Sequence, residues 1–176
     1  GYTSEDYWNL PADHRAELVD GKFYDMAPPK RIHQEIVMEL SAVIREHIRE
    51  KGGNCKIYPA PFAVNLDRED RDWVEPDISV VCDPAKLTDR GCSGAPDLVA
   101  EIVSPSSSRL DYVKKLALYS ETGVREYWIV DPDRGRTTVY FLEKADAPVL
   151  YSFDQPIASG IFPGLVVTVS DLLSGE

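Results

Sequence analysis

The chain has 176 residues, 43% of them hydrophobic, and a net charge of −11 at pH 7, which predicts one folded domain over 1–176 with a substantial core. The negative charge disfavours non-specific binding to nucleic acid, unless basic residues gather on one face. No apolar run approaches the ~20 residues of a membrane span, and the first residues lack the basic and apolar regions of a signal peptide. The three cysteines, an odd number without metal-type spacing, favour small buried or incidental thiols in a reducing cytoplasm.

The first half of the chain predicts short strands around one long helix. The expected elements are, in order, a short helix or capped turn at 7–16, a β-hairpin at 17–27, a helix between Pro29 and Gly52, an edge or bulged strand at 55–66 and a polar, solvated loop at 67–72. The hairpin is predicted because Asp-Gly is typical of a tight turn between two strands. The helix is predicted because apolar residues recur in this range at helical spacing.

The second half predicts strands separated by a lysine-bearing helix. The expected elements are a strand at 76–82, a loop at 83–96, a strand at 97–104, a capping loop at 104–108, a helix from 109 that Gly123 closes, strands at 124–130, 137–142 and 149–153, a last apolar strand at 161–169 and a final short turn capped by Ser170. This alternation of strands and helices predicts a mixed α/β domain.

Two acidic residues stand out because they belong to apolar strands. Glu101 lies inside the run 97–104, and Asp77 opens the run 76–82. An ionised carboxylate that is buried without a partner costs several kcal/mol or more, so proteins avoid it or use it. With the lysines of the following helix, these acids form a set typical of metal-assisted phosphodiester hydrolysis.

Stretches over nearly the whole chain resemble the Uma2 family, a restriction-endonuclease-like family of bacterial proteins. They are 17–21 (ELVDG), 74–78 (VEPDI), 98–105 (LVAEIVSP) and 111–119 (DYVKKLALY), which runs into 123–132 (GVREYWIVDP). The order of carboxylate strand, Ser-Pro, lysine helix and Glu-Tyr-Trp strand makes the later half specific. The resemblance implies a PD-(D/E)XK nuclease-like fold, in which helices flank a mixed central sheet, here with additional β-hairpins.

The resemblance also implies a metal site and a catalytic lysine. Asp77 and Glu101 match the two acids that bind Mg²⁺ (or Mn²⁺), and the carbonyl of Ile102 is a further candidate ligand. The superfamily lysine expected two residues after Glu101 is replaced by Val103. Lys115 is the candidate in its place, on one helix face with residues 111 and 119, and Lys114 is the alternative.

Two further residues are candidates for shaping the site, and each has a purely structural alternative. Glu17 occupies the acidic position of the ELVDG stretch, although it is equally compatible with a charge that flanks the hairpin. His33 follows the proline break, where a helix cap or a surface histidine is the common alternative. Glu101 itself could form a structural ion pair with Lys115 or Arg125.

The leading functional hypothesis is a bacterial, cytoplasmic, Mg²⁺-dependent endonuclease that hydrolyses DNA phosphodiester bonds. A homodimer is a candidate assembly, because the superfamily often cuts two strands symmetrically. The alternatives are an inactive nuclease-fold module for interaction or nucleic-acid sensing, which the acidic charge favours, and a hydrolase of a small phosphorylated ligand. A nuclease requires a basic strip beside the acids, for which the candidates are Lys30, Arg31, Arg109, Lys114 and Arg125.

Overall fold

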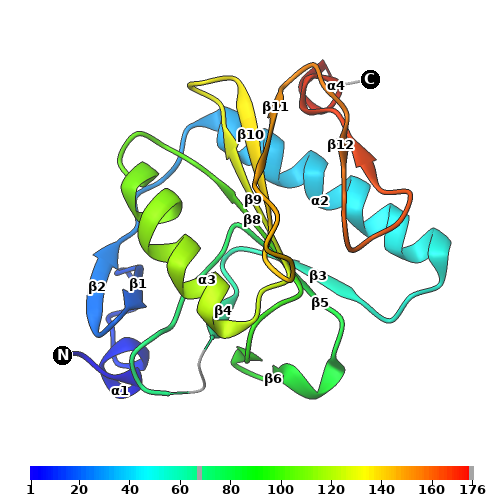
Figure 1. The fold of residues 1–176 in the computed structure, drawn as a ribbon. Coiled ribbons are helices and arrows are strands. Elements are labelled where there is room, and N and C mark those ends of the chain that lie inside the picture. Colours follow the sequence, from blue (N-terminus) through cyan, green and yellow to red (C-terminus); the bar gives the residue numbers. More distant parts are fainter. Residues whose placement is uncertain (67–68, 175–176) are drawn as a thin grey trace.

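The computed structural model describes residues 1–66 and 69–174, and a mixed six-stranded sheet forms its centre (Figure 1). In spatial order the strands are β11 (Val149–Ser152), β10 (Arg136–Phe141), β9 (Glu126–Asp131), β8 (Leu98–Ile102), β5 (Ile78–Val81) and β3 (Lys56–Pro59). Only β8 and β9 pair in parallel within this sheet of the described chain. A parallel pair requires a crossover, and the lysine-bearing helix supplies it.

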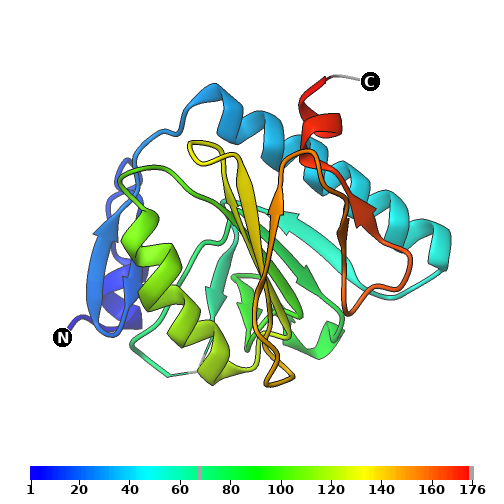
Figure 2. The same cartoon turned by 45° about the horizontal axis from the view of Figure 1, so that its top comes forward.

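Helices lie on both faces of the sheet. Helix α2 (Arg31–Lys51) packs on one face, and the π-helical turn η2 (Leu110–Lys115) with helix α3 (Leu116–Thr122) lies on the other (Figure 2). Neighbouring strand residues point to opposite faces, so the strands contribute to two separate cores. Ala100 and Trp128 pack with α2, whereas Val99 and Tyr127 pack with the side of Tyr119.

Smaller elements surround this sheet. They are the hairpin β1 (Ala16–Val19) and β2 (Lys22–Asp25), the sheet of β4 (Ala63–Asn65), β7 (Gly91–Ser93) and β6 (Leu87–Thr88), the pair β12 (Ile157–Ala158) and β13 (Val166–Val167), and the short helices α1 (Ser4–Trp8), η1 (Pro84–Lys86) and α4 (Val169–Ser174). The expected Asp-Gly turn joins β1 to β2, with positive φ at Asp20 (50°) and Gly21 (72°). Glycine and aspartate tolerate this conformation better than most residues.

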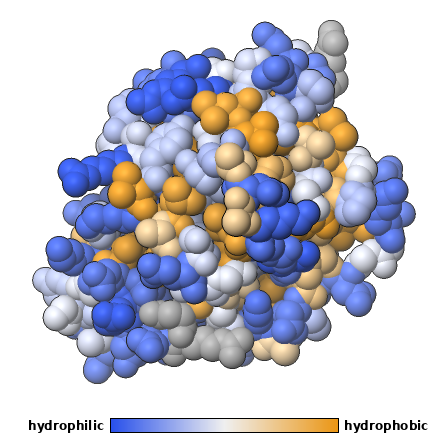
Figure 3. Space-filling view, in the orientation of Figure 1, coloured by the Kyte–Doolittle hydropathy of each residue, from blue (hydrophilic) through white to orange (hydrophobic). Residues whose placement is uncertain are grey.

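The view of the surface in Figure 3 shows hydrophilic residues along the margins and hydrophobic patches towards the middle of this face. Two of the exposed apolar side chains, Val149 and Leu150, belong to the edge strand β11. None of the described helices is both long and apolar enough to cross a membrane.

Several predicted elements are corrected. The single strand expected at 55–66 divides into β3 and β4, which belong to different sheets, although β3 does lie at a sheet edge as expected. The expected loop at 83–96 contains η1, β6 and β7, and the expected strand at 161–169 shortens to the two residues of β13. The first helix begins earlier than predicted, at Ser4.

The polar loop at 67–72 is a further correction. Residues 67–68 lie outside the described residues. Asp72 is buried instead of solvated, and its Oδ1 accepts a hydrogen bond from the backbone amide of Asp20 at 2.7 Å. Residues 71–72 therefore pack against the β1–β2 turn, a contact between distant segments that local polarity does not reveal.

The prediction of three free thiols is wrong. Cys55 and Cys82 form a disulfide with an S–S distance of 2.07 Å, whereas Cys92 is a buried thiol whose Sγ donates to the carbonyl of Gly94 at 3.3 Å. The pairing of β3 with β5 places Lys56 opposite Val81, so the two cysteines just beyond them face each other. The inference of a reducing cytoplasm, which rested on free thiols, loses that support.

Candidate active site

The antiparallel pairing of β5 with β8 brings Asp77 and Glu101 together. Ile78 lies opposite Ala100 in the register, so Asp77 reaches the backbone beside Glu101. The amide of Asp77 donates a hydrogen bond to Oε1 of Glu101 at 2.9 Å, and the amide of Ile102 donates to Oδ2 of Asp77 at 2.8 Å. Each acid is thus held by the backbone of the other strand, which fixes their relative position.

Lys115 approaches this pair from the crossover helix. Its ammonium Nζ lies 2.6 Å from Oε2 of Glu101, 2.8 Å from Oε1 of Glu17 and 3.5 Å from Oδ1 of Asp111. Only 3% of the Lys115 side chain is exposed. One buried ammonium is therefore shared by three buried carboxylates, which we call the carboxylate–lysine cluster.

The spacing of four residues along the helix aligns the inward-facing side chains. Asp111, Lys115 and Tyr119 are all buried, as expected for residues on one face. The Tyr119 hydroxyl donates to Oε2 of Glu101 at 3.1 Å, and the Tyr127 hydroxyl donates to the backbone carbonyl of Asp111 at 2.9 Å. These hydroxyls hold the helix and the acid in register.

Glu17 enters the cluster from strand β1. Its Oε1 faces Lys115, and its Oε2 accepts a hydrogen bond from the backbone amide of Glu75 at 2.8 Å. Glu75 is itself buried, and its side chain accepts from the Tyr7 hydroxyl at 2.9 Å and from Arg15 at 3.0 Å. The hairpin is thereby fixed to the segment that precedes Asp77.

His33 lies in the first turn of α2 and contacts Asp77. Its Nε2 is 3.2 Å from Oδ2 of Asp77, and its Nδ1 is 2.9 Å from Oε1 of Gln34. The side chains of His33 and Asp77 are 15% and 16% exposed, against 3% for Glu101. Asp77 and His33 therefore form the edge of the site that is accessible to solvent.

The shared ammonium determines the charge states of the cluster. Burial raises the pKa of the Glu101 carboxyl, and the nearby acids raise it further, which outweighs the lowering by Lys115. Burial also raises the pKa of Asp111, to about 6. Burial alone lowers the pKa of Lys115, but the charges of Glu101, Glu17 and Asp111 raise it well above its usual value. Lys115 is therefore a cation at neutral pH.

The pKa of His33 is also raised. Burial lowers it, but the hydrogen bond and the negative charge of Asp77 together outweigh that effect. The imidazole is therefore protonated at a higher pH than a free histidine, and it neutralises part of the Asp77 charge at the exposed edge.

The donor atoms at this edge suit a hard cation. Asp77 and Glu101 offer carboxylate oxygens, and Ile102 follows Glu101 in the same strand with its carbonyl. The described residues contain no group of three or more His, Cys, Asp or Glu arranged to hold a metal ion. One or two carboxylates completed by water and substrate phosphate is nevertheless the usual pattern for Mg²⁺, so the donor set fits.

The structure distinguishes between the two candidate lysines. Lys115 contacts the acids, whereas Lys114 is exposed and its Nζ donates to the Tyr24 hydroxyl at 2.5 Å. Arg125 pairs with Asp97 and Glu143 instead of Glu101. The sequence reasoning did not include Asp111 and Tyr119 among the site residues, although their spacing from Lys115 was a usable signal.

Comparisons with known proteins identify the family of this chain. Residues 4–170 match the Uma2 family, described as "Putative restriction endonuclease". This chain belongs to the Uma2 family. The stretches 17–21, 74–78, 98–105 and 111–119 that resemble Uma2 supply Glu17, Asp77, Glu101 and Lys115 respectively. Residues far apart in this Uma2 sequence therefore meet at one place in the fold.

The chain is also similar to a solved structure and to a curated protein sequence. A crystal structure of "a putative nuclease belonging to DUF820" from Anabaena variabilis ATCC 29413 superposes with a TM-score of 0.80 at 22% identity, over 99% of this chain and 98% of that one. This likeness confirms the predicted mixed α/β fold class. An uncharacterized protein of Synechocystis sp. strain PCC 6803, slr1290, is 27% identical over 123 residues. That match covers 70% of this chain, which spans 63% of the relative's length.

Proposed function

We propose that this Uma2 protein is a Mg²⁺-dependent endonuclease of the PD-(D/E)XK type that hydrolyses DNA phosphodiester bonds. The contact of the Lys115 ammonium with Glu101, whose other oxygen is bonded to the Asp77 amide, carries this proposal. Glu101 thus connects Asp77 to Lys115, and two neighbouring acids with a lysine are the minimal set for this chemistry. Asp77, which is 16% exposed, gives a phosphate an approach to this set, while Glu101 and Lys115 lie behind it at 3% exposure.

Each residue has a role in this proposal. Asp77 and Glu101 hold Mg²⁺ or Mn²⁺, with Ile102 contributing its carbonyl; the bound cation would supply a Lewis acid for the phosphate oxygens. Because Lys115 is protonated, it donates hydrogen bonds to the attacking water or to the phosphate and does not act as a base. His33 occupies Oδ2 of Asp77 and so orients the other oxygen of that carboxylate towards a ligand.

Glu17 has a positioning role. It holds one side of the Lys115 ammonium at 2.8 Å, so the lysine remains in place when its contact with Glu101 changes. Asp111 supports the ammonium in the same way from the helix, at 3.5 Å. The cluster therefore fixes a flexible lysine side chain before the substrate binds, which lowers the cost of ordering it in the transition state.

A second candidate function is a nuclease-fold module without turnover. Both oxygens of Glu101 already accept hydrogen bonds, from the amide of Asp77, from Lys115 and from Tyr119. A metal ion would have to compete with these donors. The net charge of −11 also opposes tight binding to nucleic acid. This candidate predicts binding of a partner without hydrolysis.

The test is cleavage of supercoiled plasmid and of single-stranded DNA with Mg²⁺, Mn²⁺ or EDTA. We expect metal-dependent cutting that Glu101→Gln reduces by at least about 100-fold, since loss of a single electrostatic stabiliser has that effect. Glu126→Gln is the matched control, because Glu126 is an equally buried acid on the neighbouring strand outside the cluster.

Three outcomes would contradict the proposal. Cutting that persists in EDTA, or that Glu101→Gln retains while it is folded by circular dichroism, would place the activity elsewhere. If wild-type protein does not cut either DNA with either metal, the module without turnover becomes the better account.

A further inference from the structure

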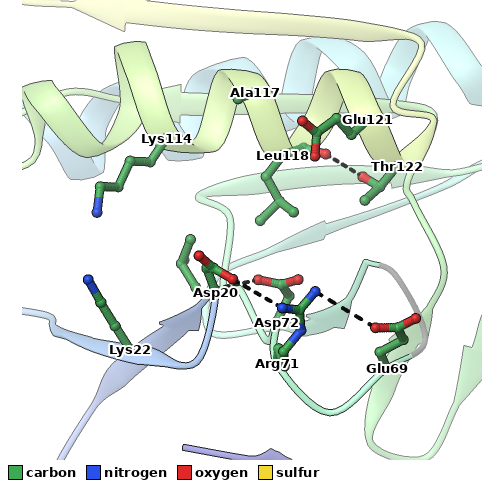
Figure 4. Close-up of a pocket in the computed structure, with 11 residues that line it drawn as sticks. Asp20, Lys22, Glu69, Arg71, Asp72, Lys114, Ala117, Leu118, Glu121 and Thr122 are labelled. Carbon is green, nitrogen blue, oxygen red and sulfur yellow. Dashed lines mark hydrogen bonds and ion pairs between the residues drawn. The ribbon is translucent and has the colours of Figure 1, made fainter. Parts of the chain in front are cut away.

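A pocket of about 570 Å³ lies between the β1–β2 hairpin and the crossover helix, and we call it the hairpin pocket (Figure 4). Its walls come from the turn of the hairpin, from residues 69–72 and from one side of η2 and α3. The residues of the carboxylate–lysine cluster do not line it. Its volume is in the range of small-molecule sites in proteins.

Two ammonium groups face each other at one end of the hairpin pocket. Lys22 projects from β2 and Lys114 from η2, and both side chains point into the opening (Figure 4). Among residues 1–66 and 69–174, neither lysine forms an ion pair, whereas Arg71 in the same pocket pairs with Asp20 at 3.4 Å and with Glu69 at 3.9 Å. The uncompensated positive charge therefore lies at the lysine end.

Lys114 is held in place at this end. Its Nζ donates to the Tyr24 hydroxyl at 2.5 Å and lies 5.2 Å from the centre of the Tyr24 ring. An ammonium has three N–H donors, so further donors remain for an anion. The other charged residues that line the pocket are Arg71 and the acids Asp20, Glu69, Asp72 and Glu121. The attraction for an anion is therefore confined to the lysine end, where Lys22 and Lys114 converge.

The rest of the hairpin pocket offers a different surface. Val19, Ala117 and Leu118 give it an apolar wall, and Leu118 points into the opening (Figure 4). Glu121 and Thr122 add hydrogen-bonding groups on the same helix. The pocket thus pairs a cationic end with an apolar wall and polar acceptors, which matches a ligand with a phosphate at one end and a flat, amine-bearing ring at the other.

We propose that the hairpin pocket binds a nucleotide unit, with its phosphate between Lys22 and Lys114 and its base against Ala117 and Leu118. This unit has two possible sources, a free mononucleotide or a nucleotide within a strand. Lys114 directly precedes Lys115 of the carboxylate–lysine cluster, so the lysine end of the pocket and the cluster belong to the same helical turn. Binding of a nucleotide within a DNA strand rests on the proposed nuclease function, whereas binding of a free mononucleotide does not depend on it.

The test measures binding by calorimetry, in EDTA and at low salt, for AMP, adenosine, inorganic phosphate and a short 5′-phosphorylated single-stranded DNA. We expect AMP and the oligonucleotide to bind, and Lys22→Glu or Lys114→Glu to weaken both roughly tenfold or more. Lys56→Glu is the matched control, because Lys56 is an exposed lysine of β3 outside the pocket. Ala117→Trp should also abolish binding by filling the pocket without changing its charge.

The relative affinities identify the source. Tighter binding of AMP than of the oligonucleotide indicates a free nucleotide, and the reverse order indicates a strand. The proposal is overturned if wild-type protein binds neither probe, if both charge reversals bind as wild type does, or if inorganic phosphate binds as tightly as AMP. Because EDTA removes the metal and no cleavage is measured, a negative result in the cleavage test does not alter this readout.

Discussion

Glu101 and Glu126 lie on the two parallel central strands, and both are buried, at 2% and 0% exposure. Within the described part of the chain, Glu126 accepts hydrogen bonds from three neutral donors: Trp128 Nε1 at 2.9 Å, the Ser159 hydroxyl at 2.9 Å and the Gly160 amide at 2.6 Å. Glu101 instead contacts the Lys115 ammonium, which it shares with two other carboxylates.

The difference separates a structural acid from a candidate functional one. Dipolar donors around Glu126 satisfy its oxygens and fix the segment at 159–160 to the sheet. Around Glu101, several carboxylates share one cation, so the cluster retains negative charge that an added cation can compensate. Burial alone does not mark a functional acid, whereas an excess of like charge around a shared cation is a better indicator.

The largest effect is expected from removing the shared cation. Lys115→Met leaves three buried carboxylates without an ion-pair partner, which should reduce the free energy of unfolding by about 3–5 kcal/mol at pH 8. At pH 5 the loss should be smaller, because Glu101 and Asp111 can bind protons in the folded variant. Urea unfolding at the two pH values measures this. An equal loss at both values would show that the lysine contributes through packing alone.

The pH dependence of stability gives the next largest effect. The folded pKa of Asp111 is about 6 and its ordinary value is 3.8. Its contribution to stability is complete below pH 3.8 and is lost as the pH rises through 6, by up to about 3 kcal/mol. Asp111→Asn should therefore gain stability relative to wild type across this window, as measured by urea unfolding at a series of pH values. Parallel curves for the two proteins would contradict the prediction.

The smallest expected effect compares the two acids directly. Glu126→Gln should lower the free energy of unfolding by about 1.5–3 kcal/mol, because hydrogen bonds to a charged acceptor become neutral ones, and should leave the affinity for Mn²⁺ unchanged. Glu101→Gln should lose Mn²⁺ binding and change stability less, since it removes one of several crowded negative charges. Calorimetric titration with Mn²⁺ and urea unfolding test both. Loss of Mn²⁺ binding in both variants would remove the distinction between the two acids.

Much of the fold was predictable because local patterns specify it. The Asp20-Gly21 pair correctly predicted the hairpin. Helical spacing of apolar residues correctly predicted α2 between Pro29 and Gly52, and Ile36 and Leu40 are buried as that spacing requires. The apolar runs at 76–82, 97–104 and 124–130 correctly predicted strands β5, β8 and β9. The strand at 55–66 was misjudged because its division between two sheets depends on distant partners, β5 and β7.

The candidate site was predictable only in part. Asp77, Glu101 and Lys115 could be named in advance through the resemblance to Uma2, and Glu17 and His33 as supporting residues. Their contacts could not, because each comes from a different element and the distances depend on strand register and helix packing. Asp111 and Tyr119 were visible only as positions on a helix face until the tertiary structure placed Tyr119 against Glu101 and Asp111 against Lys115.

The sequence by itself determined the types of the main elements, the negative charge and the identity of the acids within apolar strands, since these depend on composition and short-range spacing. Only the tertiary structure decided that Glu101 shares a lysine while Glu126 does not, that Cys55 meets Cys82, and that Lys22 faces Lys114. Each of these facts joins residues distant in the chain, and the energy of a buried charge or thiol depends on the neighbours that packing provides.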